Sequence, residues 1–426
     1  MRTHRRWRFA ALAIACCLAA VTAGTITGAG AQSSSTQGVS DTEIKVGGLG
    51  DSAGFFSEAT MGLGAQARFA RANKTGELPG KRKIDMVAWG DIKADTATSV
   101  QEERRLIQQE GVFAIVPNSS AFTAGQVPNQ LHVPVFGFGI SPGYCSAVNA
   151  PNYFFGFDGC VVPPPTTKVV GDNSFLFKKA AESEGIIKPG TKGRIAFIGP
   201  DNERAKFAIA GFYASATANG LDVVYAKAST PPPPTVIGDY TPYVQQVLAT
   251  KPDIIFSLGV ASDYIGLGKA LQAAQYKGMY VIPAADPQLA PLVPDSYAQT
   301  NWGPNEAAAT TPAIKQMLDD FEAYKPGTVP GNAMVIGWLA ADHFIAALKK
   351  AGKNLTTVKL QQAAAKMTYQ EKGLIGPTPY PASRKLTTPN CHAFLKTDGK
   401  TYTIINNYVC SSKVYKIPSY ESIQKG

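Results

Sequence analysis

The sequence predicts an α/β protein of two lobes with similar construction, each with a parallel sheet covered by helices on both faces. Short runs of continuous apolar character alternate with segments of helical periodicity, and this alternation occurs twice along the chain. Continuous apolar strands separated by helices are typical of parallel sheets buried on both sides. At 426 residues, the chain is long enough to bury two cores.

The predicted strands form two series, and helical segments lie between them. The first series is EIKVGG (43–48), KIDMVAW (83–89), VFAIVP (112–117) and VPVFGFG (133–139). The second is RIAFIG (194–199), DVVYAK (222–227), DIIFSLG (253–259) and MYVIPA (279–284). Apolar stripes at helical spacing predict helices around Met61, Ala65 and Phe69, and around Trp338 and Ile345.

Two proline runs interrupt the alternation. Pro163 to Pro165 can continue neither a strand nor a helix, so the region NYFFGFDGCVVPPPTTK (152–168) is a candidate crossover or linker. The second run, TPPPPT (230–235), is interpreted as a stiff surface loop.

The first 31 residues have the three-part pattern of an export signal. A basic MRTHRRWR precedes an apolar stretch, and small residues end it, so we expect cleavage after Ala31 and a flexible lead-in at 32–41. Arg5-Arg6 is a weak twin-arginine signal, and lipid attachment at Cys16 is the alternative. No later segment reaches the ~18 consecutive apolar residues that span a membrane. The expected location is therefore the periplasm or cell envelope.

The charge of the chain does not favour nucleic acid. Loss of the four arginines of the signal lowers the formal charge from +10 to +6, and the remaining Lys and Arg are scattered. A nucleic-acid surface needs a basic stripe with interleaved aromatic residues, and the sequence shows none.

Four cysteines remain after cleavage, and an even number in an oxidising compartment favours two disulfides. Three pairings are possible. We favour Cys145–Cys160 and Cys391–Cys410, because each closes a short segment within one predicted lobe. No CxxC is present and histidines are few, so a zinc site is not expected.

The motifs of common catalytic and nucleotide sites are missing. The sequence has no G-x-x-x-x-G-K-[ST], H-E-x-x-H or G-x-S-x-G, and in the glycine-rich stretch 47–58 the third glycine of a dinucleotide loop is replaced by Ala53. An enzyme is therefore disfavoured, and no cofactor or metal is expected.

With catalytic motifs missing, the sequence favours a protein that binds a small molecule. Loops at the carboxyl ends of parallel strands lead into helix N-termini, where unpaired N–H groups attract carboxylates. The candidate loops combine small and hydroxyl residues: GDSAGFF (50–56), PNSSA (117–121), GISPGY (139–144) and PDNER (200–204). The alternative is that Ser119, Ser120 and Ser141 only cap helices.

The same stretches resemble periplasmic solute-binding proteins of the branched-chain amino acid type. The similarity begins at EIKVGGLGDSAGFFSEATMGLGAQARFARANKTG and returns in RIAFIGPDNERAKFAIAGFYASATANGLDVVYAKAS and GWLAADHFIAALKKAG, covering nearly all of 42–376 in order. HAFLKTDGKTYTIINNY is similar to the closing strands of that family. The resemblance implies a type I periplasmic binding fold, in which two Rossmann-like lobes are joined by a three-crossover hinge. The expected lobes are 42–157 with about 286–375, and 158–285 with about 376–426.

The resemblance also implies where a ligand would be held. The loops after the third and fourth strands, here Asn118 to Ser120 and Ile140-Ser141, hold a carboxylate. In the second lobe, Arg204 stands where the family usually has a Tyr, and it could pair with an acid group. Ala284 stands where the family has the Glu that binds the ligand's amino group, and Asp286 lies two residues later. This departure disfavours an ordinary branched-chain amino acid, since a buried ammonium would lose its partner. The full set of expected ligand contacts is Ser52, Gly54, Phe55, Phe56, Asn118, Ser119, Ser120, Ile140, Ser141, Arg204, Asp263, Ala284 and Asp286.

The expected function is capture of a small amino-acid-like or carboxylate-bearing, partly apolar molecule and its delivery to the membrane permease of an ABC importer. A monomer is expected. The alternatives are a ligand-sensing receptor subunit with the same fold and, less favoured, an exported α/β enzyme.

Overall fold

The computed structural model describes residues 36–52, 58–120, 122–145, 151–161, 168–233, 235–381 and 390–424. The expected leader with Cys16 and Ala31, and the candidate contacts Gly54, Phe55 and Phe56, lie outside these residues. Within the described part of the chain, no helix is long and apolar enough to cross a membrane.

The first lobe is built on a five-stranded sheet in which every neighbouring pair is parallel. Its strand order is β2-β1-β3-β4-β5. The strands are β1 (Glu43–Gly50), β2 (Lys83–Asp91), β3 (Ala114–Asn118), β4 (Val135–Gly137) and β5 (Phe154–Gly156).

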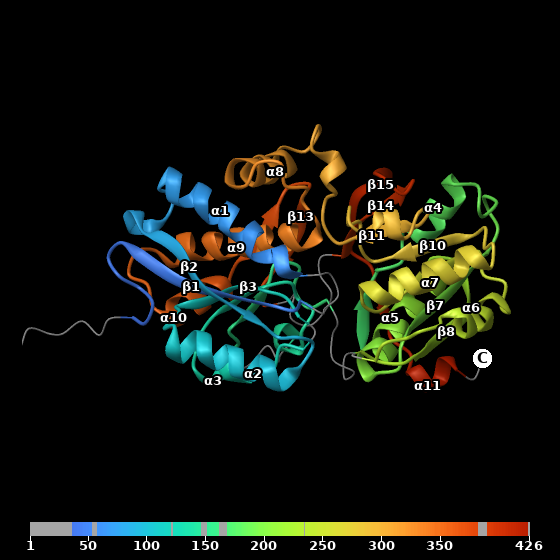
Figure 1. The fold of residues 1–426 in the computed structure, drawn as a ribbon, viewed down its shortest axis with the longest axis horizontal. Coiled ribbons are helices and arrows are strands. Elements are labelled where there is room, and N and C mark those ends of the chain that lie inside the picture. The colour runs from blue at the N-terminus through green and yellow to red at the C-terminus, as the bar shows by residue number, and fades with distance from the viewer. Residues whose placement is uncertain are drawn as a thin grey trace, which may run out of the picture. The chain divides into compact units, whose positions relative to one another are not determined.

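Helices pack on both faces of this sheet because its side chains alternate between two apolar clusters. Val46 and Val116 pack with Phe69 and the helices α1 (Met61–Thr75) and α9 (Asn332–Ala351), whereas Leu49 and Ile115 belong to the cluster on the other face. α1 and α9 run in close contact (Figure 1). The remaining helices of this lobe are α2 (Thr96–Arg104), which continues as a π-helix (Arg105–Gln109), α3 (Gln126–Gln130), α8 (Pro312–Tyr324) and α10 (Thr357–Ala364).

Two glycines allow α1 and α9 to touch backbone to backbone. A Cβ at Gly64 would lie 1.9 Å from the carbonyl oxygen of Met334, and one at Gly337 would lie 2.0 Å from that of Met61. Any side chain at either position would push the helices apart, so glycine is required at this crossing.

The second lobe is built on a seven-stranded sheet in the order β15-β14-β11-β10-β9-β7-β8. Neighbours from β8 to β11 are parallel, and β14 and β15 join antiparallel. The strands are β7 (Gly193–Pro200), β8 (Leu221–Thr230), β9 (Ile254–Ser257), β10 (Met279–Ile282), β11 (Tyr297–Thr300), β14 (Asn390–Thr397) and β15 (Tyr402–Ser411). The helices are α4 (Phe177–Ser183), α5 (Glu203–Ala218), α6 (Thr241–Leu248), α7 (Ala261–Ala273) and α11 (Tyr420–Ile423).

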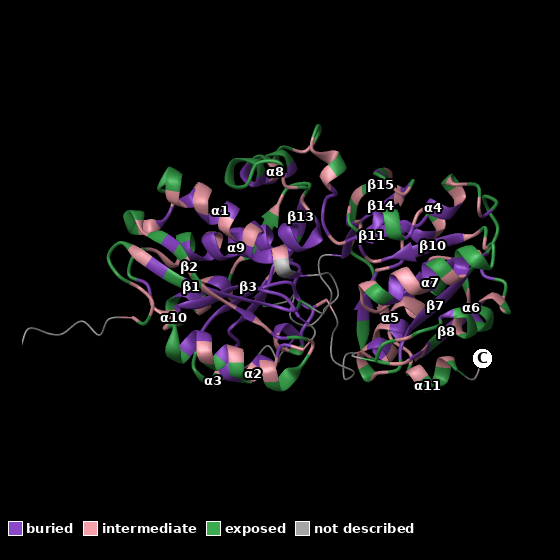
Figure 2. Ribbon diagram, viewed as in Figure 1, coloured by how far each residue is buried: buried purple, intermediate pink, exposed green. Residues whose placement is uncertain are grey.

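The central strands of both sheets are buried, as continuous apolar runs require (Figure 2). Two small antiparallel pairs accompany them: β12 (Thr368–Glu371) with β13 (Ile375–Pro379), and β6 (Val169–Gly171) with β16 (Val414–Lys416). Short 3₁₀ helices occupy Glu58–Thr60, Pro79–Lys81, Pro142–Cys145, Ala290–Leu292 and Asn305–Ala307.

The strand order confirms the predicted class: all eight predicted strands form, as β1 to β4 and β7 to β10. The chain passes between the two sheets three times: after β5, after β11 and before β14. We expected its return to the first lobe near residue 286; β11 pairs with β10, so the seven-stranded sheet extends to Thr300. The short, polar sequence YAQT of β11 carries no strand pattern, which explains the difference.

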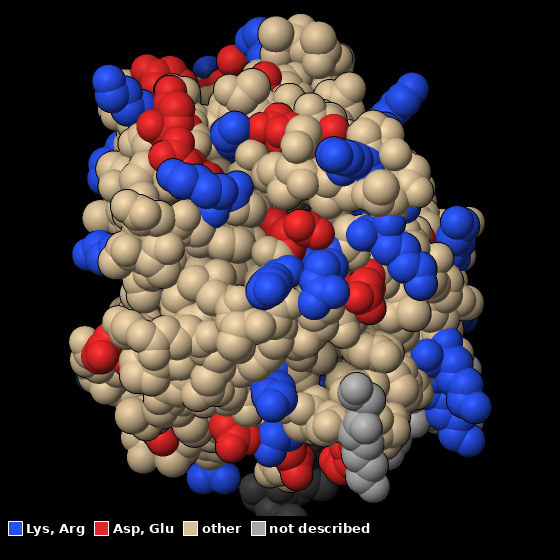
Figure 3. Space-filling view, turned by 90° about the vertical axis from the view of Figure 1, so that its right-hand side faces the viewer, with Lys and Arg blue, Asp and Glu red and all other residues tan. Residues whose placement is uncertain are grey.

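Both favoured disulfides are present. Cys145 is bonded to Cys160, and Cys391 is bonded to Cys410, which lies opposite it on the neighbouring strand. On the second-lobe side of the molecule, basic and acidic side chains are interspersed over the part that the structure describes (Figure 3).

Candidate ligand-binding site

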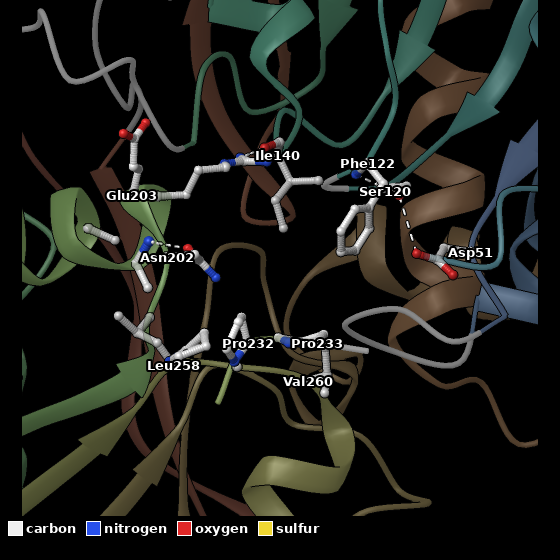
Figure 4. A pocket seen from close by; sticks show the side chains of 15 residues that line it. Asp51, Ser120, Phe122, Ile140, Asn202, Glu203, Pro232, Pro233, Leu258 and Val260 are labelled. Carbon is white, nitrogen blue, oxygen red and sulfur yellow. Dashed lines mark hydrogen bonds between the residues drawn. The ribbon is translucent and has the colours of Figure 1, made fainter. Parts of the chain in front are cut away.

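A cavity of about 380 Å³ lies where loops of both lobes meet. The loops that line it follow the carboxyl ends of strands, where α/β folds bind ligands. The first lobe contributes Asp51, Ser120, Phe122 and Ile140. The second lobe contributes Pro200, Asn202, Glu203, Arg204, Ala205, Ala208, Pro232, Pro233, Leu258, Gly259 and Val260 (Figure 4).

Most of this wall is apolar, with a few polar groups. Phe122 and Ile140 face Pro232, Pro233 and Leu258 across the cavity (Figure 4). An apolar cavity of a few hundred Å³ with a few placed polar groups is typical of small-molecule sites.

Asp51 brings a carboxylate to the first-lobe wall. It follows β1 directly, its Oδ1 accepts a hydrogen bond from the backbone N–H of Ala94 at 2.9 Å, and its Oδ2 accepts one from Ser120 Oγ at 3.3 Å. Ser120 Oγ also accepts from the N–H of Phe122 at 2.9 Å. The predicted contact Ser120 therefore lines the cavity, and its hydroxyl is oriented by Asp51.

Ser119 is turned away from the cavity. Its Oγ donates to Glu58 Oε1 at 2.7 Å, and Glu58 Oε2 accepts the backbone N–H of Asp51 at 2.7 Å. Burial raises the pKa of Glu58 well above its ordinary value, and the bonds from Ser119 and Asp51 only partly offset this. The Ser119 hydroxyl supports the loop after β1.

The other predicted polar contacts of the first lobe are also held within that lobe. Asn118 Oδ1 accepts from Tyr144 Oη at 2.7 Å, and Ser52 Oγ donates to Asp91 Oδ2 at 2.7 Å. Ser141 is fully buried, and its Oγ has no hydrogen-bond partner among the described residues. None of these three lines the described cavity.

Arg204 links the two walls. Asn202 Oδ1 accepts from the N–H of Ala205 at 2.9 Å and so caps α5, which places Arg204 in the first turn. From there the Arg204 guanidinium donates to the carbonyl oxygen of Ile140 in the first lobe. Burial lowers the pKa of Arg204 to about 10, because desolvation disfavours the charged guanidinium.

Three predicted contacts of the second lobe lie outside the cavity. Asp263 is in the first turn of α7, where its carboxylate accepts from the N–H of Val260 at 2.9 Å and from Tyr240 Oη at 2.8 Å. Ala284 follows β10 by two residues and is buried. Asp286 accepts the N–H of Asn332, at the start of α9, at 2.8 Å.

Several lining residues were not predicted. Asp51 lies within the glycine-rich stretch 47–58, and its position directly after a buried strand could have indicated it as a ligand contact. Pro232 and Pro233 belong to the proline run interpreted as a surface loop, and they line the cavity. Among the residues that the structure describes, no three His, Cys, Asp or Glu side chains gather as a metal site would require.

Two α/β lobes, three passages between them and a cavity at their facing loops define a type I periplasmic binding protein. The model of the family described as periplasmic binding protein matches residues 43–398, and the chain belongs to this family. A search of curated protein sequences finds no significant match.

Solved structures with this fold share little sequence with the chain. The fatty acid ABC transporter substrate-binding protein of Thermomonospora curvata is 19% identical with a TM-score of 0.70, over 90% of this chain and 97% of that one. A substrate-binding protein of an ABC transporter from Aeropyrum pernix is 16% identical with a TM-score of 0.68, over 90% and 100%. A solute-binding protein from R. palustris, in complex with 4-hydroxybenzoate, is 18% identical with a TM-score of 0.63, over 90% and 100%. At these identities the likeness shows the fold.

Proposed function

We propose that this chain is an extracytoplasmic solute-binding protein that captures a small, partly apolar, carboxylate-bearing molecule between its lobes and delivers it to an ABC-type permease. The observation that carries the proposal is the cavity whose wall comes from both lobes. A molecule that fills it contacts Ile140 on one side and Leu258 on the other.

A ligand that contacts both lobes couples its binding to closure of the lobes. A ligand shifts a conformational equilibrium only by the difference in its affinity for the two states. A molecule that touches both walls favours the closed arrangement, whereas one that touches a single wall does not. A permease that docks the closed form would thus receive loaded protein.

Other observations agree with this proposal. The leader pattern and two disulfides fit an oxidising compartment outside the cytoplasm. Solute-binding proteins of ABC transporters with the same fold have been solved in complex with 4-hydroxybenzoate, 3,4-dihydroxybenzoic acid and benzoate.

Native mass spectrometry of gently purified protein, followed by calorimetry with the extracted molecule, tests the proposal. We expect a single co-purified organic acid, reversible one-to-one binding and no turnover. Ala208→Trp, which fills the cavity from α5, should abolish binding. Ala214→Trp on the same helix, outside the cavity, should leave binding unchanged. Equal binding by both variants, or conversion of the molecule, would reject the proposal.

A further inference from the structure

We infer that the ligand is an apolar-bodied hydroxy acid whose carboxylate binds Arg204 in the second lobe and whose distal hydroxyl donates to Asp51 in the first. This inference rests on the proposed function and names its substrate class. It reverses the orientation that the resemblance implied, in which serines of the first lobe hold the carboxylate.

The first-lobe serines cannot serve a ligand carboxylate in this arrangement. A serine has one O–H proton to donate. Ser120 donates its proton to Asp51 at 3.3 Å, and Ser119 donates its proton to Glu58 at 2.7 Å. Both hydroxyls are therefore committed to carboxyl groups of the chain itself.

The first-lobe wall instead favours a donor. Asp51 lines the cavity and is almost completely buried, and an ionised carboxylate only accepts hydrogen bonds. A ligand carboxylate beside Asp51 would meet a like charge in a poorly solvated place. A ligand hydroxyl there would donate to an ionised acceptor, which gives a strong hydrogen bond.

The second-lobe wall favours an acid. Arg204 lines the cavity, and a guanidinium carries five N–H donors in a planar fork that matches a carboxylate. Arg204 also lies in the first turn of the 16-residue α5, where the helix dipole favours negative charge. Glu203 is exposed, and its carboxylate points away from the middle of the cavity (Figure 4).

The groups between the two ends exclude an α-amino acid. An α-ammonium beside the acid would lie near the Arg204 cation and would need an anion of its own. The position expected to supply it is Ala284, and Asp286 binds the N–H groups of Gln288 and Asn332. The body of the ligand meets Phe122, Ile140, Pro232, Pro233 and Leu258.

Calorimetry with matched probes tests the inference. The probes are 4-hydroxybenzoate, benzoate, methyl 4-hydroxybenzoate and leucine, with 10-hydroxydecanoate and decanoate as a longer pair. We expect one hydroxy acid to bind at least about tenfold more tightly than its ester or deoxy partner, since a lost charged hydrogen bond costs about that much. Leucine should bind weakest.

Three variants, at Arg204 and at Asp51, test the two ends of the ligand separately. Arg204→Gln should abolish the preference for acid over ester, and Arg204→Lys should keep part of it, which also controls for folding. Asp51→Asn replaces a charged acceptor by a neutral amide oxygen, so it should weaken the preference for the hydroxyl and keep that for the acid. Unchanged acid binding by Arg204→Gln, or a hydroxyl preference that is undiminished in Asp51→Asn, would overturn the inference.

The remaining outcomes separate this inference from the proposed function. If the co-purified molecule is an acid without a hydroxyl group, or a hydroxy acid whose binding needs neither Arg204 nor Asp51, the inference fails and the proposed function stands. If the co-purified molecule is a hydroxy acid whose binding needs Arg204 and Asp51, the inference is supported whatever the size of its apolar body. If nothing co-purifies and no probe binds, both fail.

Discussion

At the scale of single residues, the hydroxyl of Ser119 is a structural group. Ser119→Ala would leave the buried Glu58 Oε1 without its donor, so we expect a loss of about 1–3 kcal/mol in the free energy of unfolding. Ser141→Ala removes an oxygen that has no hydrogen-bond partner among the described residues, so it should be neutral or slightly stabilising. Urea denaturation of both variants measures the contrast, and equal losses would contradict this assignment.

The sequence could not reveal this difference. A serine directly after a buried strand is typical of a ligand donor, and Ser119 and Ser120 have the same local pattern. Their partners decide their roles, and Glu58 is 61 positions away from Ser119. Arg204 lines the cavity and lies in the first turn of α5, directly after a strand, a position that the sequence pattern indicated. Its contact with the Ile140 carbonyl depends on how the lobes meet, which no local pattern encodes.

At the scale of elements, the start of α9 depends on a distant carboxylate. The residue before Asn332 is Gly331, which has no side-chain oxygen to cap the helix, and Asp286 supplies the acceptor. Asp286→Ala should therefore cost about 1–2 kcal/mol of stability, as loss of a helix cap does, with ligand affinity unchanged. Asp286→Asn retains an acceptor and should lose less.

Thermal unfolding and calorimetry on the same samples distinguish the two roles of Asp286. A stable Asp286→Ala protein that no longer binds its co-purified molecule would make this residue a ligand contact, as the resemblance implied. A destabilised protein with intact affinity would make it a helix cap.

Elements with a strong pattern were predicted, and elements defined by their partners were not. Continuous apolar runs form β7, β9 and β10, and these runs were sufficient to predict the three strands. β11, with the sequence YAQT, is a strand because β10 and β14 pair with it on either side. For this reason no local pattern indicated that the seven-stranded sheet continues to Thr300, past the lobe boundary predicted near 286. Short strands with a polar sequence take their structure from the sheet that they join.

At the scale of the whole molecule, the three connections between the lobes meet around one aromatic cluster. Phe157, on the first connection, stacks on Phe138 with ring centroids 5.9 Å apart, and Trp302, on the second, packs edge-on to both rings. Thr378, near the third, donates its hydroxyl to the carbonyl oxygen of Phe157 at 2.8 Å. A substitution in this aromatic cluster should therefore alter the packing of all three connections between the lobes.

Asp158 lies next to Phe157 in this region, and its carboxyl group is buried. Its Oδ1 accepts the N–H of Gly139 at 2.9 Å, and its Oδ2 has no hydrogen-bond partner among the described residues. Burial raises the pKa of Asp158 from 3.8 to about 7. Between these values the folded chain holds a proton that the unfolded chain has released, so this group favours folding below about pH 4 and loses that contribution as the pH rises to about 7.

Asp158→Asn keeps an acceptor for Gly139 and removes the titration. We expect the free energy of unfolding of the variant, relative to that of the parent, to rise by up to about 1.4 kcal/mol per pH unit between about pH 4 and pH 7 and to level off above. The comparison with the parent is needed because other buried groups also make the stability depend on pH. Burial raises the pKa of Glu371 to about 7, so Glu371 changes the stability in the same direction as Asp158. Burial lowers the pKa of His392 to about 4, so His392 changes it in the opposite direction. Both groups remain in the variant and cancel in the difference. Urea denaturation of the two proteins across pH 4 to 8 measures it, and parallel stability curves would show that Asp158 is ionised among the connections at every pH in that range.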